Sequence, residues 1–136
     1  AGLYEEKTYE SFSSKVSNIR LELTSILKRL KLENKRIIGY GAPAKGNTLL
    51  NYCKINSRIL DYISDTTPYK QGRYSPGMHI PIISPDKFHS DNPDYAIMLP
   101  WNFKDEILEK ERDFINKGGK FIIPIPKPSI FPEEKK

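Results

Sequence analysis

The stretch Arg36-Ile-Ile-Gly-Tyr-Gly-Ala-Pro-Ala-Lys-Gly46 decides the fold class of this chain. It begins as a short apolar run, passes through a loop rich in glycine, and leads into residues 47–53, where apolar residues recur at helical spacing. Gly39, Gly41 and Ala44 match the pattern G-x-G-x-x-A, in which glycine lets the backbone turn tightly and approach a phosphate closely. The stretch therefore predicts a buried strand, a tight turn and a helix whose N-terminal N–H groups can receive an anion.

Strands and helices alternate on the C-terminal side of this stretch. Apolar runs predict four further strands, at residues 57–64, 79–83, 94–99 and 120–125. A brief helical turn is predicted at residues 85–89. A longer helix is predicted to begin with the capping pair Asn102 and Asp105 and to end at Gly118. This order predicts an α/β fold, with a Rossmann-like parallel sheet of about four to five strands flanked by helices.

A long amphipathic helix is predicted on the N-terminal side. Apolar residues alternate three and four positions apart on one stripe of residues 9–31, namely Tyr9, Phe12, Val16, Ile19, Leu23, Ile26 and Leu30. Thr8 is the expected N-cap and Asn34 the expected stop. Such a stripe packs on its own domain, on a neighbouring domain or on a second copy of the chain. We therefore divide the chain into a helical lead-in (1–33), a Rossmann-like domain (34–128) and a flexible tail (129–136).

Composition limits the classes of protein. A chain of 136 residues suits one domain, and 22 Lys and Arg against 17 Asp and Glu leave a net charge of +5, spread along the chain. Such a modest surplus favours a small anionic ligand over a nucleic acid. The single cysteine, Cys53, excludes an internal disulfide and a multi-cysteine zinc site. No run of about 18 apolar residues predicts a membrane span and no segment has the pattern of a signal peptide, so we expect a cytoplasmic protein.

Lys45 is the strongest candidate for binding an anion. An ammonium group near a helix N-terminus is unfavourable unless an anion faces it, so we expect Lys45 to bind a pyrophosphate, with Gly41, Ala42 and Gly46 forming the loop around it. Asp65 closes the second predicted strand 24 positions after Gly41, where an acidic residue binds a ribose hydroxyl in dinucleotide folds. A tight turn with a solvated lysine, and an ordinary acidic turn residue, are the alternatives.

Further candidate ligand contacts follow the predicted strands, open the helix after the glycine loop or, for His79, begin a predicted strand: Asn47, Lys70, Gln71, His79, Trp101 and Asn102. Asn47 can instead cap the helix, and Trp101 can close a domain interface instead of stacking on a base. The loop residues can be solvated turn residues, His79 can be structural, and His89 is expected on the surface. The sequence contains no suggestive Ser/His/Asp set and no metal-ligand spacing, so no residue is assigned a catalytic or metal-binding role.

Taken together, these segments resemble the C-terminal domain of sugar-nucleotide C-methyltransferases. The similarity runs in one order through residues 39–53, 65–72, 76–82, 93–95, 99–102 and 118–124. Gly2, Leu3, Tyr9 and Phe12 are also similar to the helical lead-in of that family. Full-length members resemble a three-part enzyme with a cysteine-rich zinc module, a central S-adenosylmethionine-binding domain and a Rossmann-like domain. The resemblance implies that this chain corresponds to the third part alone.

The resemblance also implies a division of labour. The C-terminal domain helps to hold a nucleotide-diphosphate sugar, typically a dTDP-linked keto-deoxysugar. The central domain binds S-adenosylmethionine and supplies the acid and base groups, so no cofactor is expected on this chain. Two alternatives stay open. One is the NAD(P)-binding domain of an oxidoreductase, which the glycine pattern and Asp65 favour. The other is a dimerisation or assembly module built on the helical stripe, and a homodimer is compatible with the first interpretation as well.

Overall fold

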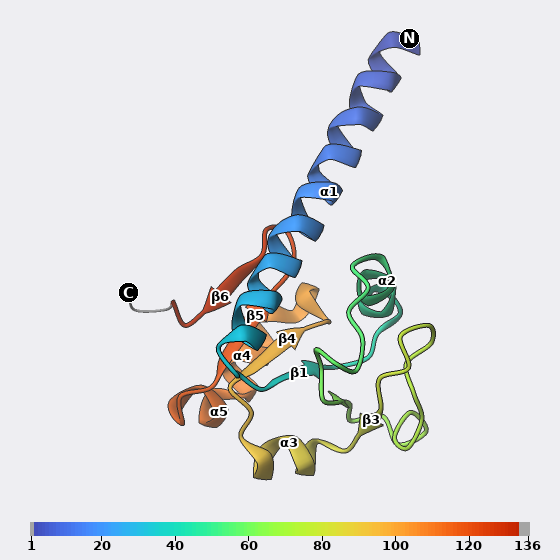
Figure 1. Cartoon of the computed structure of the whole chain (residues 1–136). Coiled ribbons are helices and arrows are strands. Elements are labelled where there is room, and N and C mark those ends of the chain that lie inside the picture. The colour runs from blue at the N-terminus through green and yellow to red at the C-terminus, as the bar shows by residue number, and fades with distance from the viewer. Residues whose placement is uncertain (1, 134–136) are drawn as a thin grey trace.

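Parallel pairing places the glycine stretch in the middle of a six-stranded sheet (Figure 1). The computed structural model describes residues 2–133, with side chains from Lys15 onward. Its strands are β1 (Ile37–Tyr40), β2 (Ile63–Ser64), β3 (Ile82–Ile83), β4 (Tyr95–Met98), β5 (Lys120–Ile123) and β6 (Ser129–Phe131). They lie in the order β3-β2-β1-β4-β5-β6, and all neighbours are parallel except β5 and β6. The predicted α/β class and parallel sheet are confirmed, with one antiparallel strand added at the edge.

Alternating side chains along the strands build an apolar core on each face of the sheet. Ile37 of β1 and Ile97 of β4 belong to one core, whereas their chain neighbours Ile38 and Ala96 belong to the other. Strands that are buried on both faces read as continuous apolar runs instead of alternating ones. This double burial is the reason that the central strands are visible in the sequence.

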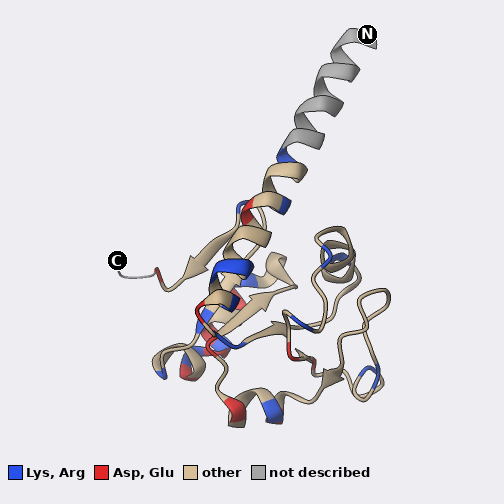
Figure 2. Ribbon diagram, viewed as in Figure 1, with Lys and Arg blue, Asp and Glu red and all other residues tan. Residues whose placement is uncertain are grey.

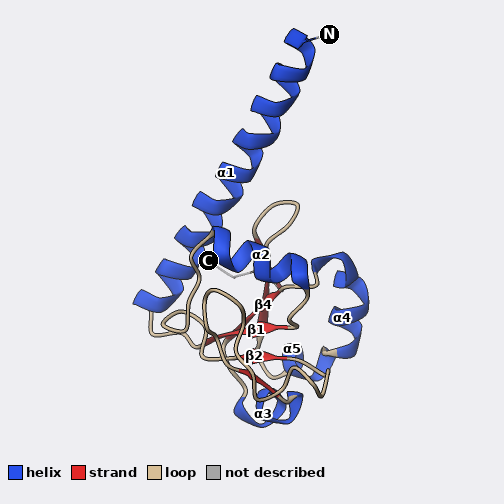
Figure 3. Ribbon diagram, turned by 90° about the vertical axis from the view of Figure 1, so that its right-hand side faces the viewer, coloured by secondary structure: helices blue, strands red, loops and turns tan. Residues whose placement is uncertain are grey.

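Helices cover both faces of the sheet (Figure 3). One face carries α1 (Gly2–Leu32) and α2 (Ala44–Tyr52), and the other carries α3 (Pro85–Asp91), α4 (Lys104–Lys110) and α5 (Arg112–Asn116). A short 3-10 helix, η1 (Trp101–Phe103), joins β4 to α4. On the second face the rings of Phe88 and Phe114 pack with their centroids 4.8 Å apart. The sheet is therefore the middle layer of three.

The N-terminal helix packs on the core of its own domain through part of the predicted stripe. Leu23 and Leu30 are fully buried there, as the stripe predicts. Leu27 is buried between them, whereas Ile26 is only partly covered. Leu23, Leu27 and Leu30 are four and three residues apart, which keeps them on one helical face. This segment therefore belongs to the first core of the domain.

The ends of this helix test two further expectations. Thr8 is not the N-cap, because α1 begins at Gly2. The stop near Asn34 is confirmed, since the helix ends at Leu32 and Asn34 has φ 61°, the left-handed conformation that ends helices. The side chains of Tyr9 and Phe12 lie outside the described residues. In the described part of the chain, no helix is both long and apolar enough to cross a membrane.

Two strands are shorter than predicted, and the chain end is more ordered. Residues 57–64 contribute only β2, because a turn in which Leu60 N donates to Asn56 O precedes it. His79 does not begin a strand, since it has φ 57° and β3 starts three residues later. Within the segment assigned to the tail, residues 129–131 form β6, which pairs with β5 along the edge of the sheet. An edge strand tolerates the prolines that flank β6.

The helix predicted after β4 differs at its start and in its middle. Asn102 and Asp105 do not form a capping pair, because Asn102 lies within η1 and α4 begins at Lys104 without a side-chain capping hydrogen bond. The single predicted helix is divided into α4 and α5 by Glu111, whose backbone has φ −102° and ψ 31°. The predicted stop at Gly118 is confirmed, and this glycine has φ +98°.

Candidate functional site

The carboxyl ends of β1 and β4 mark the point where the chain leaves the sheet in opposite directions. From β1 it continues into α2 on one face, and from β4 into α4 on the other. Connections of this kind open a crevice in which α/β folds bind ligands. Gly41, directly after β1, has φ +79°, and a Cβ there would lie 2.7 Å from Pro100 Cγ. Glycine is therefore required for the left-handed backbone and for the close approach of the two loops.

Three hollows surround the turn after β1. The switch-point cavity, of about 350 Å³, lies between the segments that follow β1, β2 and β4. The tyrosine hollow, of about 560 Å³, is lined by Tyr69 and Tyr74 from the loop after β2. The tryptophan hollow, of about 290 Å³, is lined by Trp101. Pro43, the residue before α2, lines all three hollows. The start of α2 is therefore the point at which the hollows meet.

The structure distributes the predicted site residues over these hollows. Those that line the switch-point cavity are Gly41, Ala42, Asp65 and Lys70. Those that line the tyrosine hollow are Ala42, Asn47 and Lys70. Those that line the tryptophan hollow are Lys45, Trp101 and Asn102. The predicted residues that line none of the three are Gly46, Gln71 and His79.

Asp65 ties the loop after β2 to the glycine turn. Its carboxylate accepts hydrogen bonds from Ala42 N at 2.8 Å and from Thr67 N at 2.7 Å. Gln71 Nε2 donates to the backbone oxygen of Asp65 at 2.8 Å, and Lys70 Nζ donates to Ala42 O at 3.0 Å. The Asp65 carboxylate is thus bonded to the turn itself, and the Ala42 amide is not available to a ligand. Gln71 has a structural task in the same network.

The N-terminus of α2 supplies the donors that the turn does not. Pro43 is the N-cap and no side chain caps the helix. Asn47 N donates to Pro43 O, so the helix leaves the N–H groups of Ala44, Lys45 and Gly46 without an intrahelical acceptor. Their partial positive charge adds to that of the Lys45 ammonium, and no acidic residue lies in the first turn. This end of α2 therefore presents N–H donors and positive charge without an acidic neighbour in its first turn.

Gly46 and Asn47 occupy different positions from those predicted. α2 begins at Ala44, so Gly46 lies inside the helix and not in the loop. A Cβ on Gly46 would lie 2.7 Å from Leu99 Cβ, which shows that glycine lets α2 pack closely on the sheet. Asn47 does not cap the helix. Its side-chain oxygen is buried and has no hydrogen-bond partner among the described residues.

His79 lies outside the three hollows, and its ring meets Tyr74 edge to face with the centroids 5.1 Å apart. It therefore supports a tyrosine that lines the tyrosine hollow. The loop that carries Tyr74 is also tied to α2, because Asn51 Nδ2 donates to Pro76 O at 3.0 Å. These contacts hold the tyrosine hollow in shape from both sides.

The sequence reasoning missed a polar group on the far wall of the switch-point cavity. Glu111 is buried, and its carboxylate lies 2.9 Å from His89 Nε2. Tyr40 lines the same cavity, and burial together with the nearby Glu111 carboxylate raises the pKa of its hydroxyl. His89 is exposed as expected, but it also covers this carboxylate. A sequence signal existed, since Glu111 takes an inward position of the stripe that contains Ile107 and Phe114.

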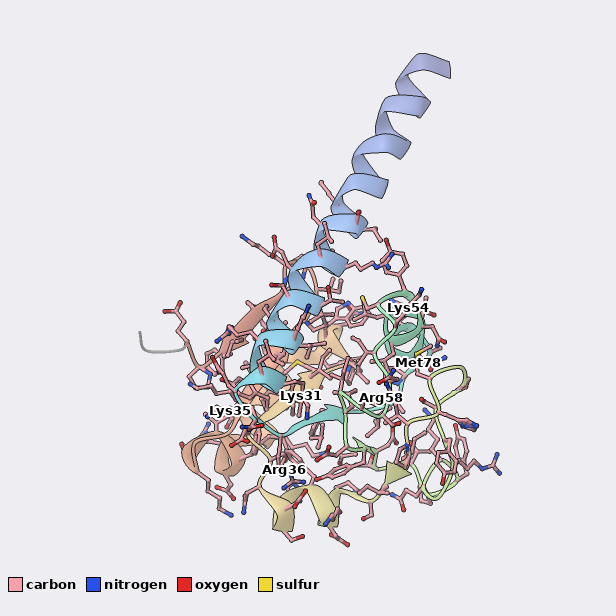
Figure 4. The ribbon with its side chains drawn as sticks, in the orientation of Figure 1. Lys31, Lys35, Arg36, Lys54, Arg58 and Met78 are labelled. Carbon is pink, nitrogen blue, oxygen red and sulfur yellow. The ribbon has the colours of Figure 1, made fainter. Side chains whose placement is uncertain are left out.

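Charges are unevenly divided around the site (Figure 2). α2 and the loop after β2 carry the basic charges of Lys45, Lys70 and Arg73, and the one acidic group there is Asp65, whose carboxylate is bonded to backbone N–H groups. α4 and α5 mix acidic and basic residues. The basic side chains labelled in Figure 4 line none of the three hollows. The site therefore has a basic side at α2 and a mixed side at α4.

The fold and this crevice define a class, a Rossmann-like α/β domain with a helix N-terminus and cations beside the crevice. The chain belongs to the family described as the C-methyltransferase C-terminal domain, and the match spans residues 1–126. It is 38% identical over 133 residues to the C-methyltransferase NovU of Streptomyces niveus. That similarity covers 98% of this chain and 32% of NovU, so the chain spans about a third of the length of this relative. The resemblance stated from the sequence is confirmed.

Proposed function

We propose that this domain binds the diphosphate of a nucleotide sugar at the N-terminus of α2, while an S-adenosylmethionine-binding domain outside this chain carries out methyl transfer. The observation that carries the proposal is the uncapped start of α2, where three hollows meet. Membership of the C-methyltransferase family supports the transferase setting. The substrate class that we infer is a dTDP-linked keto-deoxysugar.

The chemistry of a diphosphate fits the groups at this helix end. Its oxygens only accept hydrogen bonds, and they carry negative charge that a helix N-terminus stabilises. The exposed residues Ala44 and Lys45 provide two N–H groups, and the Lys45 side chain provides a point charge. Lys70 lies on the other side of Pro43 and lines two of the hollows. We place the diphosphate here, in the first turn of α2, and not on the Ala42 amide that Asp65 occupies.

The tyrosine hollow is the place that we assign to the nucleoside. Tyr69 and Tyr74 are exposed by 69% and 59%, unusual values for large aromatic side chains in a folded domain. Aromatic faces stack on bases, and each such contact contributes about 1–3 kcal/mol. Arg73 adds a cation to the same hollow. A base in this hollow and a diphosphate at α2 would be joined through the ribose over Pro43.

The two alternative functions are less well supported by the geometry. A dinucleotide would require the Asp65 carboxylate to accept ribose hydroxyls, but this carboxylate accepts the N–H groups of Ala42 and Thr67. An assembly module would require an uncovered helical stripe. In the described side chains of α1, Leu23 and Leu30 are covered by their own domain. The nucleotide-sugar proposal uses the features that these alternatives leave unexplained.

Isothermal titration calorimetry of this chain tests the proposal. We expect dTDP to bind and S-adenosylmethionine and NADH not to bind. Lys45→Ala should weaken dTDP binding by about 1–3 kcal/mol, because a charged hydrogen-bond partner of the anion is lost, with little change in stability. Lys28→Ala is the matched control, since Lys28 is also an exposed helical lysine and lines none of the hollows.

Two results would contradict this function. Binding of S-adenosylmethionine without binding of dTDP would assign the site to the methyl donor. Equal dTDP affinity in the wild type and in Lys45→Ala would remove the diphosphate from the start of α2.

A further inference from the structure

The wall of the switch-point cavity opposite the glycine turn contains a buried carboxylate that packing alone does not explain. The Glu111 side chain is only 5% exposed. It lies four residues after Ile107 and three before Phe114, both of which belong to the second core. An apolar residue would extend that core at this position. A buried carboxylate lowers stability unless hydrogen bonds compensate for its lost hydration, so its presence points to a role in the cavity.

The hydrogen-bonding capacity of this carboxylate is not used up by the protein. His89 Nε2 lies 2.9 Å from one Glu111 oxygen and 3.4 Å from the other. An ionised carboxylate offers about four acceptor positions and no donor, so the His89 ring N–H and the Tyr40 hydroxyl together leave room for a further donor. The neighbouring Tyr40 hydroxyl keeps its proton, because burial and Glu111 raise its pKa. It donates this proton toward the Glu111 carboxylate, and its oxygen can accept a hydrogen bond from a ligand hydroxyl.

We propose that Glu111 and Tyr40 form a hydroxyl-binding subsite for the sugar of the nucleotide sugar. The inference rests on the proposed function. A phosphate brings only acceptors and negative charge and is repelled by a carboxylate, whereas sugar hydroxyls can donate to the carboxylate and to the phenol oxygen. The switch-point cavity, of about 350 Å³, has a volume typical of small-ligand sites.

The two ends of the cavity then fix the direction of the ligand. Pro43, the N-cap of α2, and Lys70 line the cavity on the side that we assign to the diphosphate, and Glu111 lines it on the side that we assign to the sugar. Glu106 and Lys110 also line the wall at α4, but both are exposed and carry opposite charges in water. The buried Glu111 carboxylate is therefore the group on this wall that would bind a sugar hydroxyl and repel a phosphate.

Calorimetry with dTDP and with dTDP-glucose separates the sugar contribution from that of the nucleotide. We expect the wild type to bind dTDP-glucose more tightly than dTDP. Glu111→Gln should lose most of this ratio of affinities, by about five- to tenfold, while its affinity for dTDP itself stays the same, because a neutral amide forms a weaker hydrogen bond with a sugar hydroxyl than a carboxylate does. Glu109→Gln is the control, since it removes an equal charge from an exposed position outside the cavity.

Tyr40→Phe keeps the ring contacts with Phe88 and Phe121 and removes only the hydroxyl, so it reports on the subsite even if Glu111→Gln does not fold. The ratio of its affinity for dTDP-glucose to its affinity for dTDP should fall as well. A wild type that binds both ligands equally, or a ratio that survives in Glu111→Gln or Tyr40→Phe, would overturn the subsite. Failure of the wild type to bind dTDP at all would instead overturn the proposed function.

Discussion

Charged residues are arranged differently at the two ends of the parallel strands, which we call the amino edge and the carboxyl edge of the sheet. At the amino edge, the Arg36 guanidinium bonds Asp61 at 3.2 Å and Asp91 at 2.9 Å, and the Tyr62 hydroxyl donates to Asp91 at 2.9 Å. Figure 4 shows Arg36 beside the passage from α1 into β1. At the carboxyl edge, Lys45 has no ion-pair partner among the described residues, and the first N–H groups of α2 have no cap.

This difference separates charges that hold the fold together from charges that are available to a ligand. A network whose members satisfy one another contributes to stability and leaves nothing for a partner. An uncapped helix end with an unpaired ammonium contributes little to stability, and its exposed donors can exchange water for the oxygens of an anion. Substitutions at the amino edge should therefore change stability alone. Substitutions at the start of α2 should change ligand binding.

The largest effect is expected at the glycine turn. Gly41→Ala forces an alanine into the left-handed backbone of this position and places its Cβ 2.7 Å from Pro100 Cγ. We therefore expect a loss of about 2–4 kcal/mol in the free energy of unfolding. Gly72→Ala is the matched control, because Gly72 has φ +83° and nothing within 4 Å of its Cβ position. It should lose only about 1–2 kcal/mol, the cost of the backbone conformation. Urea unfolding measures both, and equal losses would show that the contact with Pro100 is unimportant.

An intermediate effect is expected for Asp65→Asn. The substitution replaces two charge-assisted bonds to Ala42 N and Thr67 N by weaker or lost ones, so stability should fall by about 1–3 kcal/mol. Hydrogen exchange at the Ala42 and Thr67 amides should accelerate more than exchange in β4. Unchanged protection of these two amides would mean that Asp65 does not hold the turn.

A smaller, pH-dependent effect is expected at the amino edge. The hydrogen bond from Arg36 lowers the pKa of Asp91 from an ordinary 3.8 to about 2. A depressed carboxyl pKa contributes stability that is complete above the unfolded pKa and is lost as pH falls from about 4 to about 2. Asp91→Asn should lower stability at pH 7 by about 1–2 kcal/mol and flatten the pH dependence of unfolding in that window. It should leave dTDP affinity unchanged, and weaker dTDP binding would contradict the division between the two edges.

The glycine turn and the central strands could be predicted because their signals are local. Gly41 needs a conformation that few residues adopt, and the strands are apolar on both faces. The fully buried Leu27 was missed, because a strict alternation of three and four placed Ile26 on the stripe instead. β6 was missed since prolines surround it, and prolines are common in edge strands as well as in tails.

The composition of the site depended on contacts between distant segments. The sequence could not show that Asp65 would bond the Ala42 amide, 23 residues away, and so move the available donors into α2. Nor could it bring His89 and Glu111 together, 22 residues apart. The inward position of Glu111 on an apolar helical stripe was the one local sign of its burial. A charged residue at an inward position of an apolar stripe thus indicates a buried polar group.

The measurement that tests the central claim most directly is amide NMR of this chain during titration with dTDP. The account predicts that the largest shift changes occur at the Ala44, Lys45 and Gly46 amides and saturate together. The amides around Arg36 should not respond. Saturable changes centred on the amino edge, with the first turn of α2 unaffected, would contradict it.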